Sequence, residues 1–108
     1  MSNLNIFKTE TAVLTTGGAT IYTAPAEYSA IILLAQISNV TGNVVNATFS
    51  ILDGATTTEL IKDFGIPGND AASATVGKLV LETGKSIVAS ASANSSLKLV
   101  LSVLESKN

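Results

Sequence analysis

Apolar residues recur at every second position along most of this chain, and this period is the feature that most constrains its fold. The clearest stretch lies near the C-terminus, where Leu97, Leu99, Leu101 and Val103 alternate with other residues. Such alternation is typical of β-strands with one buried face, whereas a surface helix repeats its apolar residues about every 3.6 positions. No segment shows the helical period, so the sequence predicts an all-β protein.

Turn signals cut the alternating pattern into short strands. Gly17-Gly18 separates two of them, the segment 40–42 separates the next two, and further turns are predicted at Gly84 and Asn94. We expect a hairpin at each turn. At the second turn the expected facing pairs are Ile37 with Val45, Ala35 with Ala47, Leu33 with Phe49, and Ile31 with Ile51. At the third and fourth turns Leu81 is expected to face Ile87, and Ala91 to face Leu97.

The pattern as a whole indicates about seven or eight short antiparallel strands and no substantial helix. An antiparallel β-sandwich with a jelly-roll-like arrangement is the predicted fold. A chain of 108 residues is expected to form one domain. We place it at residues 12–105, after an N-terminal arm at 1–11 and before a C-terminal tail at 106–108. The arm is either a frayed terminus or a segment that docks on a neighbour through Leu4, Ile6 and Phe7.

Composition excludes several classes of function. The chain has no cysteine and no histidine, which removes disulfides, thiolate metal sites and the commonest general base. Its basic residues are all lysine and its net charge is −2, so nucleic-acid binding is not expected. Neither a membrane-spanning run nor a secretory signal is recognisable. Charged residues make up only 13% of the chain, which favours a protein that works inside an assembly.

The tripeptide Gly84-Lys85-Ser86 resembles the end of a phosphate-binding loop, but the match fails. That loop needs a glycine at the position of Leu79 and a helix after the lysine, whereas the sequence predicts a strand there. The lysine is therefore expected at a hairpin tip.

The acidic residues of the middle of the chain show no catalytic pattern either. Asp53, Glu59, Asp63 and Asp70 are expected to be solvated charges, and their spacing is not that of a calcium loop. A calcium site at Asp53 or Asp70 is the alternative. No catalytic constellation, cofactor site or small-molecule substrate is predicted.

Several apolar residues fall on the strand face opposite the expected core. They belong either to a two-sided core or to an oligomer contact. These residues are Ile32, Leu34, Leu52, Val88, Val100 and Leu104.

Four segments also resemble a known group of proteins. They are "YTAP" at 22–25 before a long strand, the turn "NVTG" at 39–42, the stretch "KLVLETGKSI" at 78–87, and the final strand "LKLVLSVLE" at 97–105. Over residues 12–105 the chain resembles small structural proteins of tailed bacteriophages, frequent in phages of cyanobacteria and marine bacteria. The resemblance implies a β-sandwich virion component, assembled in the host cytoplasm, and not an enzyme.

Within that class, a capsid decoration (cement) protein is the leading hypothesis. It would bind the major capsid protein as a dimer or trimer and stabilise the shell. The second hypothesis is a neck, tail or baseplate component that binds other virion proteins. The third is a carbohydrate-binding module of a host-recognition structure, which the low aromatic content of 5% disfavours.

Overall fold

Nine β-strands and no helix make up the part of the chain that the computed structural model describes, which is residues 5–75 and 77–108. The strands are β1 (Asn5–Val13), β2 (Ala19–Thr23), β3 (Tyr28–Asn39), β4 (Val45–Asp53), β5 (Thr56–Ile66), β6 (Ala71–Ser73), β7 (Leu79–Leu81), β8 (Ser86–Ala91) and β9 (Leu97–Lys107). The predicted all-β class is confirmed.

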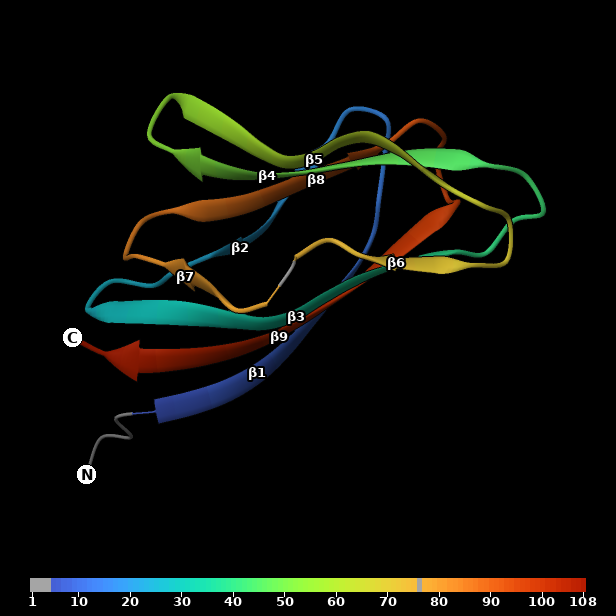
Figure 1. The fold of residues 1–108 in the computed structure, drawn as a ribbon. Coiled ribbons are helices and arrows are strands. Elements are labelled where there is room, and N and C mark those ends of the chain that lie inside the picture. The colour runs from blue at the N-terminus through green and yellow to red at the C-terminus, as the bar shows by residue number, and fades with distance from the viewer. Residues whose placement is uncertain (1–4, 76) are drawn as a thin grey trace.

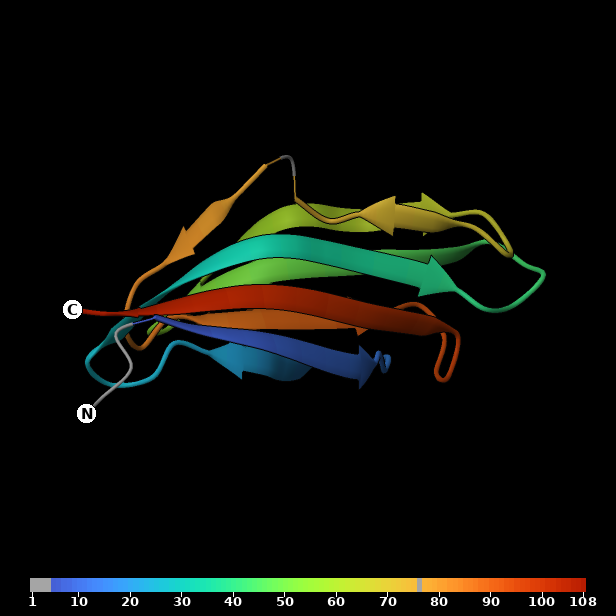
Figure 2. The same ribbon diagram turned by 90° about the horizontal axis from the view of Figure 1, so that it is seen from below.

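The strands form two antiparallel sheets that pack face to face (Figure 1). Sheet A has the order β1-β9-β3, with β6 and β7 both paired to the far side of β3. Sheet B has the order β2-β8-β4-β5. Figure 2 shows β1, β9 and β3 side by side, with β1 at one edge of sheet A and β6 and β7 at the other.

The connections follow the jelly-roll pattern. β6 pairs with residues 36–38 of β3 and β7 with residues 30–32, so the two short strands occupy one strand position. Counted this way, the chain alternates between the sheets at every step except β4 to β5. Eight strand positions in two sheets, connected in this order, form a jelly roll. The jelly-roll-like sandwich predicted from the sequence is therefore confirmed.

The predicted hairpins are wrong. At each of the four predicted turns, the strands on either side lie in opposite sheets. Among residues 5–75 and 77–108, the one tight hairpin joins β4 to β5 at Gly54, whose φ of 62° suits glycine. The inward phase of Leu81 and Ile87 is nevertheless right, because both are fully buried between the sheets.

A bulge in β3 explains an error in the predicted core. The register with β9 shifts between Ile32 and Leu34, so the inward side chains change from Ala30 and Ile32 to Ala35 and Ile37. Ile32 was predicted on the second face, but it lies in the core and is fully buried. The run of apolar residues at 30–35 carries no alternation that could have located the bulge.

Residues 5–11 are not a free arm. They belong to β1, which pairs with β9 over nine residues from Asn5–Ser106 to Val13–Lys98. The predicted tail is likewise shorter than expected, because β9 continues to Lys107. The first four residues, Leu4 among them, lie outside the described part of the chain.

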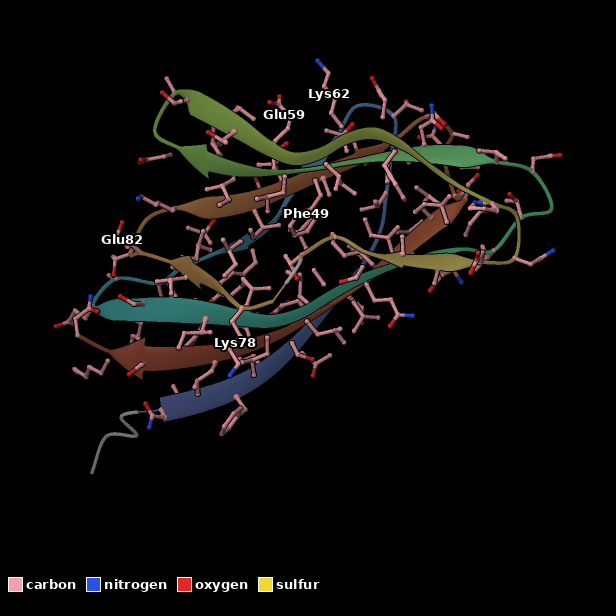
Figure 3. All side chains as sticks on the ribbon, viewed as in Figure 1. Phe49, Glu59, Lys62, Lys78 and Glu82 are labelled. Atoms are coloured by element: carbon pink, nitrogen blue, oxygen red, sulfur yellow. The ribbon has the colours of Figure 1, made fainter. Side chains whose placement is uncertain are left out.

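The core lies between the two sheets and consists mainly of aliphatic side chains, as the sequence predicts. Phe49 is the largest fully buried side chain, and Figure 3 shows it between the sheets. Burying a side chain of this size contributes about 3 kcal/mol relative to leaving it exposed.

Candidate interaction surface

The outer face of sheet A is defined by the phase of β9. Leu99, Leu101 and Val103 are buried in the core, so Val100, Ser102 and Leu104 point outwards. Residues paired directly across an antiparallel sheet point to the same side. The register therefore identifies every outward residue of the neighbouring strands.

Four apolar side chains from four different strands form a row across this face. Phe7 of β1 pairs with Leu104 of β9, Leu104 with Ile31 of β3, and Ile31 with Val80 of β7. Neighbouring strands are about 4.8 Å apart, so the row extends for about 14 Å. Its two ends are the most open, with Phe7 74% and Val80 64% exposed. We call these four residues the apolar row.

Further apolar side chains border the apolar row on the same face. Leu34 and Val100 are 40% and 37% exposed, and both point outwards. A shallow hollow beside the row is lined by Phe7, Lys8, Thr9, Leu33, Ser102 and Val103. The centre of the outer face of sheet A is thus mainly apolar, with a few polar residues between the apolar ones.

The outer face of sheet B is different, because hydroxyl side chains dominate it. The register places on this face Thr20, Thr23, Thr48, Thr57 and Ser90, together with Ser50 and Ser86, which are buried. Its apolar members Leu52 and Val88 are half-buried among them. The two broad faces of the sandwich therefore differ in chemistry, one apolar at its centre and one rich in serine and threonine.

The predicted interface residues do not form one surface. Phe7, Leu34, Val100 and Leu104 share the outer face of sheet A, whereas Leu52 and Val88 lie on sheet B. Ile6 is half-buried and points to the opposite side of β1 from Phe7.

Sequence reasoning missed Ile31 and Val80. The alternation placed Ile31 on the core face, and it placed Val80 on the opposite face without including it among the interface residues. The pairing of β7 with β3 brings the two residues together, and no local sequence signal reports that pairing.

A buried polar cluster links the sheets near β1. Glu105 of β9 is 1% exposed, its Oε1 lies 3.2 Å from Nζ of Lys8, and its Oε2 accepts a hydrogen bond from the hydroxyl of Tyr22. Burial, and then the hydrogen bond to Glu105, raise the pKa of the Tyr22 hydroxyl. Lys8 on β1 and Tyr22 on β2 each contact one carboxylate oxygen of Glu105. The cluster therefore connects β1 and β9 of sheet A to β2 of sheet B.

Lys85 lies at the turn between β7 and β8, followed by a strand, so the sequence argument against a phosphate loop holds. Its Nζ lies 2.6 Å from Oε1 of Glu82 and 3.6 Å from Oδ2 of Asp53. The hydrogen bond to Glu82 is the main cause of the raised pKa of Lys85. The lysine is thus ion-paired within its own chain.

The acidic residues do not converge on a metal site. Asp53 is paired with Lys85, and Oδ1 of Asp70 accepts a hydrogen bond from the Ala71 amide. Among residues 5–75 and 77–108, no cluster of three or more acidic, cysteine or histidine side chains has a metal-binding arrangement. The same residues include no helix long and apolar enough to cross a membrane.

Comparisons with known proteins give a fold but no family. No family of known proteins matches the sequence, and no curated protein is recognisably similar to it. A chain of the acidic stable capsid structure of Helicobacter pylori bacteriophage KHP30 superposes with a TM-score of 0.56 at 12% identity, over 98% of this chain and 90% of that one. A chain from the disulfide-linked pili that form Bacillus endospore appendages superposes with a TM-score of 0.55 at 13% identity, over 96% and 88%. At these identities, the likeness is one of fold.

Proposed function

We propose that this chain is a non-enzymatic structural protein of a bacteriophage virion, and specifically a capsid decoration protein that binds the major capsid protein. The observation that carries the proposal is the contrast between the two outer faces. An exposed apolar row suits a surface that another protein covers, and a face of serine and threonine suits water. A protein that docks on a shell has one face against the shell and the other face towards the solvent. The jelly-roll fold shared with a phage capsid chain supports this assignment.

The stabilising effect would come from mass action. Covering apolar surface contributes about 25 cal/mol per Å² removed from water, so one copy with a small contact binds weakly. A component that binds the assembled shell and not its free subunits shifts the assembly equilibrium towards the shell. Many copies on one shell then act together.

The other candidates have less support. A neck, tail or baseplate component would use the same surface, and the number of copies per particle separates it from a decoration protein. A pilus joined by disulfides is not available to this chain, which has no cysteine. A sugar platform would need neighbouring aromatic side chains. The most exposed aromatics, Phe7 and Phe64, lie instead on different sheets.

The proposal is tested by replacing one end of the apolar row. Val80→Ser should weaken co-sedimentation of the protein with phage shells that lack it, because Val80 is 64% exposed on the proposed contact face. Val44→Ser is the matched control, since Val44 is 66% exposed but lies in the loop between β3 and β4. Equal binding of the two variants, with both folded, would contradict docking through the apolar row.

A further inference from the structure

The two sheets have four edges, and one of them is both long and regular. β2 has five residues and a register shift, and β6 and β7 have three residues each. β5 has 11 residues, but its register with β4 shifts twice. β1 has nine residues in unbroken register with β9 and ends sheet A. A regular edge strand is a template for pairing with another chain.

The sequence of β1 complements itself when read antiparallel. Thr9 is the middle residue of Asn5–Val13. In a two-fold pairing centred on Thr9, Lys8 of each copy faces Glu10 of the other, which gives two pairs of opposite charge. The register that pairs all nine residues of the two strands therefore also places each Lys8 opposite a Glu10.

Two further kinds of pair in this register are also compatible. On the outer face Thr9 meets Thr9 of the second copy, and threonine pairs across strands are favourable. On the inner side Ile6 faces Ala12. The ammonium of Lys8 is 3.2 Å from Glu105, and the side chain is 41% exposed, so it can also reach a carboxylate at the edge.

The other long edge opposes self-pairing. The middle residue of β5 is Ile61, so two copies of β5 would place Glu59 opposite Asp63, with like charges facing twice. Asp63 also has a φ of 48°, which interrupts the regular strand. Figure 3 shows Glu59 and Lys62 on the outer side of this edge strand, where charge discourages pairing.

We propose that two copies of this chain associate by antiparallel pairing of β1 with β1, in the register centred on Thr9. The two A sheets then form one continuous sheet that carries both apolar rows on the same face. The dimer is inferred from the edge alone and does not depend on the function proposed above.

Measuring the mass of the purified full chain by light scattering tests this dimer. The expected mass is about 22 kDa, twice the 11.0 kDa of one chain. Thr9→Lys places two like charges at the two-fold axis and should give a monomer. Thr57→Lys, an exposed threonine on β5, is the matched control and should remain dimeric.

A second pair of variants tests the charge register. Glu10→Lys should raise the dissociation constant of the dimer by about tenfold, because it puts lysines opposite each other twice. Glu59→Lys makes the same change of charge on β5 and should leave the dimer intact. Circular dichroism and the melting temperature report whether each variant folds. If Thr9→Lys does not fold, Glu10→Lys alone tests whether the dimer forms through β1. A wild-type monomer throughout the micromolar range overturns the proposal, as does a dimer unaffected by the β1 variants.

Discussion

The hydroxyl of Tyr22 donates a hydrogen bond to the buried carboxylate of Glu105, and this bond joins the two sheets. Tyr22 belongs to β2 in sheet B, and Glu105 belongs to β9 in sheet A. Because Glu105 is 1% exposed, it has little access to water in place of its protein partners. The bond therefore matters more than an exposed contact of the same kind.

Tyr22→Phe should lower the free energy of unfolding by about 2 kcal/mol, because it leaves an oxygen of a buried carboxylate without its donor. Urea denaturation monitored by circular dichroism measures the change. Glu59→Gln, on the exposed edge strand β5, should stay within about 0.5 kcal/mol of wild type. If Tyr22→Phe were as stable as wild type, the hydroxyl of Tyr22 would not support the fold.

The same contact predicts a loss of stability at alkaline pH. The pKa of Tyr22 is raised, first by burial and then by the bond to Glu105, so the folded state favours the neutral hydroxyl. This contribution is fully present below the ordinary tyrosine pKa of about 10 and is lost as the pH rises above it. Unfolding free energies measured over this range should fall more steeply for wild type than for Tyr22→Phe. Parallel curves for the two proteins would contradict the assignment.

Gly68→Ala should lower the free energy of unfolding by about 3 kcal/mol. A Cβ at this position would clash with the carbonyl group of Gly42, and backbone atoms cannot move aside cheaply. Gly17→Ala is the control, because a Cβ there meets nothing within 4 Å. Thermal melting of both variants is the measurement. Similar melting temperatures would mean that the loops around Gly42 and Gly68 separate without cost.

Phe49→Ala should lower the free energy of unfolding by about 4 kcal/mol, because it leaves a cavity in the centre of the sandwich. Phe64→Ala removes the same side chain from a position that is 49% exposed and should have a much smaller effect. Chemical denaturation of the two variants compares them directly. If the exposed residue had the larger effect, the inward phase of β4 would be wrong.

Strand alternation was sufficient to predict the class of fold and most inward residues, but not which strands pair. Leu81 and Ile87 are both buried, as the pattern indicates. In a hairpin such residues are cross-strand neighbours, and in a jelly roll they face the core from opposite sheets. Alternation along the chain is the same in both cases. The choice between them depends on long-range pairing, which no local pattern records.

The interaction surface was predictable only in part for the same reason. Phe7 and Leu104 were expected at an interface, and they are adjacent on sheet A. Val80 joins them only because β7 pairs with β3. The bulge in β3 lies in an unbroken apolar run, so the sequence could not show that Ile32 points inwards and Ile31 outwards.

The proposed function makes this chain a component of phage virions, and the composition of purified virions tests that central claim most directly. A decoration protein covers the shell, so a stained gel should show a strong band near 11.0 kDa, with a copy number comparable to that of the major capsid protein. A faint band would contradict the decoration role and favour the neck, tail or baseplate. Absence of the chain from the particle would contradict a structural role in the virion.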